Sequence, residues 1–256
     1  MQTVREIEQA LYDLAPKDGM MHGDNVGHLV GDPEEEVKRA LVALDITESV
    51  VDEAIEKGCD LIIAHHPVIN SNWTPVQSVR CDTLKGRILT KLIRNNISAI
   101  CMHTNLDVAS GGVNDRLAER LGLENVEVME NGLIRTGCLP QPMTLRDFAA
   151  FVKDALGCNG VRYSDAGKCV FKVAVGGGTC GDYEEEVLRA GCDTFVTADL
   201  KYHQFLDARD INLVDAGHFP TEDPVCEVLI QYITAQFPEL TAEKSASHRE
   251  VIQYYV

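Results

Sequence analysis

The sequence predicts an α/β protein built of two similar α/β domains with mainly parallel sheets. Apolar, strand-like runs alternate with amphipathic, helix-like segments along most of the 256 residues, which is typical of layered α/β folds. Several helix-like segments stop at a glycine, the residue that most readily closes a helix. Stretches 53–66 and 186–199 share the order helix, Gly-Cys-Asp, apolar strand and polar end. This repeat indicates that one α/β unit has been duplicated.

The elements of the first half follow from hydrophobic periodicity and capping residues. An amphipathic helix opens the chain, with capping-box spacing between Thr3 and Glu6 and with one apolar face formed by Val4, Ile7, Leu11 and Leu14. The later elements are strand 40–46, helix 48–57 before Gly58, strand 60–65, helix 82–95, strand 97–103 and helix 113–121 before Gly122.

The second half repeats this alternation. Its elements are helix 145–156, strand 172–177, helix 183–190 before Gly191, strand 194–199, helix 201–208, strand 211–217 and helix 224–236. The first half has an additional loop, 67–82, which the second lacks. We therefore expect two domains, residues 1–126 and 127–256, without a further domain inserted between them.

Composition excludes several classes of protein. The net charge of −17 would repel duplex nucleic acid, so a small anionic substrate would need metal ions or local Lys and Arg residues. No apolar run has the roughly 18 residues of a membrane span, and the N-terminus lacks the pattern of a signal peptide. The nine cysteines include no C-x-x-C pair, which argues against a disulfide framework or a cysteine zinc finger. A cytoplasmic location is expected.

The cysteines are predicted to have structural roles. Cys59, Cys101, Cys169 and Cys192 lie in or beside apolar runs and are expected to pack as small hydrophobic residues. Cys180 lies in a glycine-rich loop, where exposure is expected.

Polar side chains gather where the predicted strands end, which is where open α/β sheets bind ligands. These residues are His65 and His66, then His103 and Asp107, then Asp199, Lys201 and His203, and finally His218 and Glu222. Imidazole and carboxylate are the ligands preferred by zinc and similar divalent metals. One ion needs about four ligands, so this longer set indicates two ions. His22, His28 and His248 lie elsewhere and are expected to face solvent.

The individual residues allow different interpretations. Two adjacent histidines at a strand end that turns into Pro67 can approach one cavity and hold different ions. Glu222 suits a bridging role because of its reach, and it is expected in the first turn of a helix. Lys201 and His203 either belong to the site or begin a helix facing solvent. The stretch GGGTCGD, 176–182, lacks the full phosphate-loop pattern, which favours a strand-to-helix turn capped by Asp182 over a phosphate cradle.

Five blocks of the sequence resemble one known family. They are GDNVGHLVGDP (23–33), LIIAHHPVI (61–69), HTNLDVASGGVND (103–115), TADLKYHQFLDA (197–208) and DAGHFPTE (215–222). Their order and content are similar to the GTP cyclohydrolase 1 type 2 homologs, or NIF-three-like proteins. Two positions depart from the family pattern, Ala198 where glycine is usual and Gly23 where tryptophan is frequent. These departures concern the shape of the pocket and affect no predicted ligand.

The resemblance implies a dinuclear metal site in the cleft between the two domains and a ring-shaped homohexamer. By position, His65 and Asp107 would hold one divalent ion, His66 and His218 the other, and Glu222 would touch both. The metals compatible with these ligands are zinc, iron, manganese, cobalt and nickel.

The resemblance and the candidate ligands together predict a metal-dependent hydrolase acting on a nucleotide-type substrate. A metal-bridged hydroxide would attack C8 of guanine in GTP and release formate. His103 or His203 would shuttle the proton, and Lys201 would offset phosphate charge. The sequence leaves open a nucleotide phosphatase or phosphodiesterase, and also a metal-binding regulatory or chaperone protein without turnover.

Overall fold

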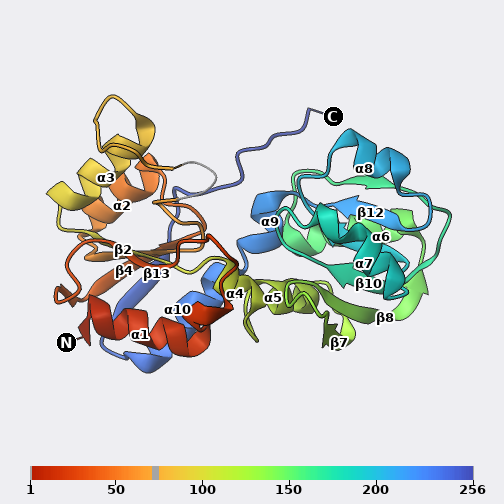
Figure 1. Cartoon of the computed structure of the whole chain (residues 1–256), viewed down its shortest axis with the longest axis horizontal. Helices are drawn as coiled ribbons and strands as arrows, with labels where there is room; N and C mark the ends of the chain where they lie inside the picture. The colour runs from red at the N-terminus through yellow and green to blue at the C-terminus, as the bar shows by residue number, and fades with distance from the viewer. Residues whose placement is uncertain (1, 71–74, 256) are drawn as a thin grey trace. The chain divides into compact units, whose positions relative to one another are not determined.

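The computed structural model describes residues 2–70 and 75–255. Contacts divide the chain into two compact units, Met1–Gly112 with Val225–Arg249, and Val113–Pro224 with Glu250–Val256 (Figure 1). This grouping differs from the expected division at residues 126 and 127, because the chain returns to the first unit after residue 224. Residues 71–74 of the predicted loop 67–82 lie outside the described part of the chain.

The first unit contains a five-stranded sheet in the order β13-β4-β5-β6-β2. Its strands are β2 (Gly27–Val30), β4 (Arg39–Ala43), β5 (Leu61–Ala64), β6 (Ser98–Cys101) and β13 (Thr241–Lys244). All neighbours are parallel except β2, which runs antiparallel to β6. The mainly parallel sheet predicted for this part is confirmed, and the carboxyl ends of β4, β5 and β6 share one edge.

Helices cover both faces of this sheet. Figure 1 shows α2 (Glu48–Lys57) and α3 (Leu84–Arg94) on one side, and α1 (Val4–Leu14) and α10 (Val225–Gln236) on the other. The predicted capping box of α1 is present, since Thr3 and Glu6 exchange side-chain and backbone hydrogen bonds. The remaining elements are β1 (Gln2–Thr3), β3 (Glu36–Val37), η1 (Lys17–Gly19) and α4 (Thr104–Val108).

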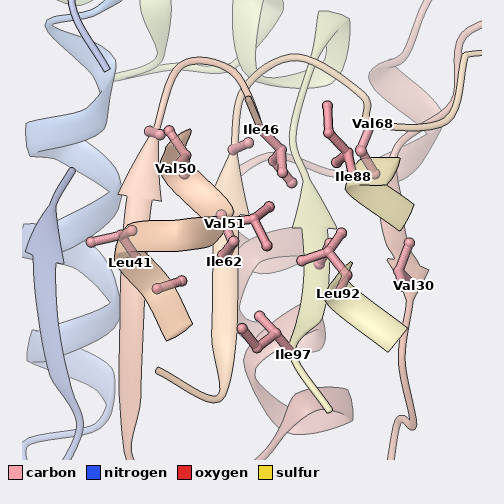
Figure 2. Close-up of a cluster of buried hydrophobic side chains, with 14 of the residues drawn as sticks. Val30, Leu41, Ile46, Val50, Val51, Ile62, Val68, Ile88, Leu92 and Ile97 are labelled. Carbon is pink, nitrogen blue, oxygen red and sulfur yellow. The ribbon is translucent and has the colours of Figure 1, made fainter. Parts of the chain in front are cut away.

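The core between the sheet and helices α2 and α3 is formed by branched aliphatic side chains (Figure 2). Ile62 of β5, Val51 of α2 and Leu92 of α3 are fully buried within it. Burial of one such side chain contributes about 1.5–3 kcal/mol. This packing fixes β5 and therefore the place at which the chain turns into the two adjacent histidines.

The second unit contains a six-stranded sheet in the order β7-β8-β10-β11-β12-β9. Its strands are β7 (Glu124–Val128), β8 (Arg135–Met143), β9 (Arg162–Ser164), β10 (Val170–Val175), β11 (Thr194–Thr197) and β12 (Asn212–Asp215). Only β10, β11 and β12 run parallel to one another, and the other three pairings are antiparallel. The prediction of a mainly parallel sheet is wrong here, because β8 adds a long antiparallel strand that the sequence pattern did not indicate.

The helices of the second unit have 3 to 12 residues. They are α5 (Val113–Arg120), α6 (Leu145–Leu156), η2 (Gly181–Tyr183), α7 (Glu184–Arg189), α8 (Tyr202–Asp207) and α9 (His218–Glu222). Leu117 of α5 and Phe148 of α6 pack with Val173 and Val196 of the sheet in one buried cluster. The longest helices in the described part of the chain, α6 and α10, have 12 residues each. Neither reaches the roughly 20 apolar residues that cross a bilayer.

The repeated Gly-Cys-Asp tripeptides, 58–60 and 191–193, have the same structural role in both units. In the first, the Asp60 carboxylate accepts hydrogen bonds from the backbone N–H groups of residues 38–39, at 2.8 and 3.0 Å. In the second, Asp193 accepts from those of residues 171–172, at 3.0 and 2.7 Å. Each aspartate therefore ties the start of its own strand to the preceding strand of its sheet. These equivalent contacts agree with duplication of an α/β unit.

Candidate metal centre

The first unit brings three histidines together at the carboxyl ends of β5 and β6. Their ring centroids are 4.9 Å apart for His65 and His66, 5.2 Å for His65 and His103, and 5.7 Å for His66 and His103. Backbone hydrogen bonds extend the strand pairing past the strand ends, from His66 N–H to the Leu44 carbonyl and from Met102 N–H to the Ala64 carbonyl. The strand ends thus hold these rings in place.

Each of the three rings is oriented through its Nδ1 atom. His65 Nδ1 bonds to the Met102 carbonyl, His66 Nδ1 to Asp45 Oδ1 and His103 Nδ1 to Asp24 Oδ1, all at 2.8 Å. A carbonyl or an ionised carboxylate only accepts hydrogen bonds, so the proton lies on Nδ1, and the neutral ring would bind a metal through Nε2. The three candidate ligand atoms lie within 4.8 Å of one another.

The orienting carboxylates are ionised at neutral pH. Burial by itself raises the pKa of Asp24, but hydrogen bonds from His103 and Thr104 outweigh it and hold that pKa well below its usual value. The pKa of Asp45 is lowered in the same way, because hydrogen bonds from His248 and His66 outweigh the effect of burial. Both carboxylates therefore act as hydrogen-bond acceptors for imidazole.

A short helix adds Asp107 to this group. Helix α4 begins directly after His103, and it carries Asp107 with its Oδ1 atom 3.5 Å from His65 Nε2. Asn105 anchors this helix by donating a hydrogen bond of 2.8 Å to the carbonyl of Ala15, which follows α1. The predicted spacing of His and carboxylate thus becomes one turn of helix that presents an anionic ligand beside a buried imidazole.

The second unit contains a similar arrangement on α9. His218 Nδ1 lies 2.7 Å from Asp199 Oδ2, and His218 Nε2 lies 2.9 Å from Glu222 Oε2, one helical turn away. Burial lowers the pKa of His218, but the hydrogen bonds and charges of Asp199 and Glu222 outweigh this and raise it to about 11. Two groups that share a proton at this distance can instead share a divalent cation, with release of that proton.

The glycine-rich loop supports Glu222 and does not form a phosphate cradle. The N–H groups of Gly177, Gly178 and Cys180 donate to Asn114, Thr221 and Thr197, respectively. A Cβ atom at Gly178, which has φ +61°, would lie 2.1 Å from Glu222 Oε1. Only a glycine therefore lets the backbone approach the carboxylate so closely.

The turn nevertheless differs from the prediction in two details. The strand-to-helix turn is present, but Cys180 occupies the N-cap position of η2 in place of the expected Asp182. Cys180 is buried and donates to the Gly177 carbonyl, so the expectation of an exposed thiol is wrong. Cys59, Cys101 and Cys192 are buried as predicted, and burial raises the pKa of the Cys101 thiol to about 12. Cys169 is exposed, contrary to the prediction.

The predicted site residues come from both units. His65, His66, His103 and Asp107 gather in the first unit, and His218 pairs with Glu222 in the second. Glu222 is the last residue of α9, so its predicted place in the first turn of the following helix is wrong. Lys201 and His203 are exposed at the start of α8, and no metal-type group in the described ranges 2–70 and 75–255 includes them.

Sequence reasoning missed the carboxylates that orient the rings. Asp45 is the second residue after β4, at the same sheet edge as His65 and His66, and this position was the available signal. Asp24 lies in the first block, and its contact with His103 joins residues 79 positions apart. His248 was expected to face solvent, which is wrong, because its Nε2 lies 3.0 Å from Asp45 Oδ2 and its side chain is 10% exposed. Of the other two, His22 is exposed and His28 is half-buried.

These donor sets fit divalent transition metals. Each unit offers imidazole nitrogens beside carboxylate oxygens, the combination preferred by zinc, iron, manganese, cobalt and nickel. The rings are also oriented by hydrogen bonds to Nδ1, which is the usual arrangement around metal-binding histidines. Residues in both units can therefore hold metal ions.

Comparison with known proteins identifies the family. The sequence model of Duf34/NIF3 (NGG1p interacting factor 3) matches residues 2–250. The chain belongs to the Duf34/NIF3 family. Two relatives in this family are named GTP cyclohydrolase 1 type 2 homolog. The protein from Clostridium acetobutylicum is 37% identical over 237 residues, covering 88% of this chain and 87% of the relative. The protein from Streptomyces coelicolor is 38% identical over 243 residues, covering 89% and 84%.

A solved structure in the family has the same fold. The crystal structure of a Bacillus cereus protein related to NIF3 matches with a TM-score of 0.92 and 27% sequence identity, covering 100% of this chain and 99% of that chain. The resemblance seen in the five sequence blocks is thus confirmed at the level of the family.

Proposed function

We propose that this chain is a metal-dependent hydrolase that holds two divalent ions per subunit. His65 and Asp107 would hold one ion, His66 and His218 would hold the second, and Glu222 would be a ligand of both. The observation that carries the proposal is the common orientation of the histidines, each with Nδ1 held by an oxygen acceptor. Such hydrogen bonds orient imidazoles for metal binding. Purely structural histidines do not need the same Nδ1 hydrogen bond at several positions.

Two divalent ions in one site supply a water-derived nucleophile at neutral pH and stabilise negative charge in the transition state. Asp107 and Glu222 balance the positive charge of the ions, and both are nearly buried. The backbone of Gly178 in the glycine-rich loop lies close to the Glu222 carboxylate. The protein residues would thus bind the ions and orient the substrate, while the ions would act as Lewis acids.

His103 is the proposed proton carrier. Its ring lies beside those of His65 and His66, and its Nδ1 is held by Asp24, so Nε2 is the atom that exchanges a proton. An imidazole suits this role because its pKa lies near neutral pH. His203 and Lys201, both exposed at the start of α8, are proposed as an alternative proton carrier and as a positive charge for an anionic substrate, respectively.

The proposed substrate is a nucleotide such as GTP, in line with the name of the relatives. Hydrolysis at C8 of guanine opens the five-membered ring and releases formate. On a chain of net charge −17, bound divalent ions would supply the positive charge that an anionic substrate needs. We further propose that the protein assembles as a homohexamer, which light scattering in solution would test.

The test is an assay of metal-loaded protein with GTP. Elemental analysis should give about two ions per chain, and formate should accumulate, while His103→Gln should retain its ions and lose at least 10²-fold in rate. His22→Gln, which alters an exposed histidine, is the matched control and should match the parent protein.

The same reactions distinguish the alternatives. Release of inorganic phosphate without formate would indicate a nucleotide phosphatase or phosphodiesterase. Ions that pass rapidly to an acceptor protein, with no product from any nucleotide, would indicate a metal carrier. Protein that binds no divalent ion after reloading would contradict the proposal altogether.

A further inference from the structure

The segment Ser245–His248, which follows β13, is held against α2 by the carboxylate of one residue, Glu53. Glu53 of α2 accepts hydrogen bonds from Ser245 Oγ at 2.6 Å, Ala246 N–H at 3.0 Å and Ser247 N–H at 2.9 Å. The Glu53 side chain is 10% exposed and also pairs with Lys57 at 2.8 Å. Such a set of bonds to one ionised group holds the segment in a single place.

The fastened segment brings His248 to the candidate metal ligand His66. His248 Nε2 lies 3.0 Å from Asp45 Oδ2, and Asp45 Oδ1 lies 2.8 Å from His66 Nδ1. The Asp45 carboxylate therefore bridges two imidazoles that are far apart in the sequence. His248 and His66 each occupy one of its oxygens.

His66 needs this support more than its two neighbours do. His65 is fully buried, and its Nδ1 bonds to a backbone carbonyl that cannot rotate. His103 is held by Asp24, whose side chain is 1% exposed and also accepts the Thr104 N–H. The Asp45 side chain is 42% exposed, so water competes for its oxygens unless a second partner fixes the carboxylate.

We propose that His248 is a positioning residue for His66, acting through Asp45. The inference rests on the proposed metal-binding role of His66. By holding Oδ2 of Asp45, His248 fixes the rotation of the carboxylate, which in turn fixes the His66 ring and the direction of its Nε2 lone pair. The segment Ser245–His248 thus affects the affinity for the ion bound through His66, whereas the affinity for the ion bound through His65 does not depend on it.

The test compares Zn²⁺ binding by full-length variants, using competition with a chromophoric chelator. His248→Ala should weaken one of the two ions about tenfold, the lower end of the effect of removing a partner of a metal ligand, and leave the other unchanged. His248→Gln, whose amide can still donate to Asp45, should restore binding to within about threefold of the parent. His22→Ala controls for loss of a histidine elsewhere.

A second measurement does not depend on metal binding. Crystal structures of metal-free His248→Ala and His248→Gln should show the Asp45 and His66 side chains rotated or in two conformers in the first variant and unchanged in the second. If the parent protein binds no Zn²⁺, the proposed function fails, and these structures still decide the role of His248. Unchanged Asp45 and His66 side chains in His248→Ala, or equal weakening of both ions, would overturn the inference.

Discussion

Replacement of Gly178 by alanine tests whether the glycine-rich loop determines the position of Glu222. The new Cβ would lie 2.1 Å from Glu222 Oε1 and 3.3 Å from His218 Cε1. The carboxylate must therefore retreat by about 1 Å, which exceeds the roughly 0.5 Å tolerance of a functional site. The backbone at φ +61° also costs an alanine about 1–2 kcal/mol of stability.

The two effects can be separated by a matched variant. Gly157 has φ +67°, and an added Cβ there meets no described atom within 4 Å. Gly157→Ala should therefore lose about 1–2 kcal/mol in urea unfolding and retain its metal. Gly178→Ala should lose a similar amount of stability and bind metal about 10–100-fold more weakly. The same metal affinity in both variants would show that the loop does not position Glu222.

Three further predictions concern the core, pH and metal removal. Leu92→Ala, in the buried core of Figure 2, should lower the free energy of unfolding in urea by about 2–5 kcal/mol. Leu84 is 56% exposed on the same helix, so Leu84→Ala should lower it by less than about 0.5 kcal/mol. Equal losses would contradict the assigned core. Burial raises the pKa of Glu53, but hydrogen bonds from Lys57 and the serines outweigh it and lower that pKa below its usual value. The resulting stabilisation is present above the unfolded-state pKa of about 4.3 and is lost as pH falls from there toward the folded pKa. The free energy of unfolding should therefore change less between pH 7 and pH 3 in Glu53→Gln than in the parent protein. An unchanged pH dependence would contradict this. Chelation should lower the melting temperature of the metal-loaded protein, since an ion at 100 times its Kd adds about 2.7 kcal/mol; no change on chelation and reloading would argue against a bound ion.

The sequence predicted the central strands and the polar side chains at their ends because both depend on local pattern. An apolar run such as 61–64 followed by polar residues marks a buried strand end, and the register of β5 with β6 then brings His65 close to His103. The ends of two helices were also predicted correctly, since α2 ends at its predicted glycine and α1 begins with its predicted capping box.

The missed elements depend on tertiary structure. Strand β8 contains two prolines and few branched residues, so its sequence does not resemble a strand, although it pairs on both sides. Strand β13 joins β4 across about 200 residues, which places Val225–Arg249 in the first unit. The link between His248 and Asp45 spans 203 positions, and no local pattern indicates such a contact.

Anomalous diffraction from crystals grown with Zn²⁺ tests the central claim most directly. We predict two zinc peaks per chain, one bound by His65 Nε2, the other by His66 and His218 Nε2, with Glu222 bound to both. Crystals saturated with zinc that show no peak at these histidines, while their Nδ1 bonds remain intact, would contradict it.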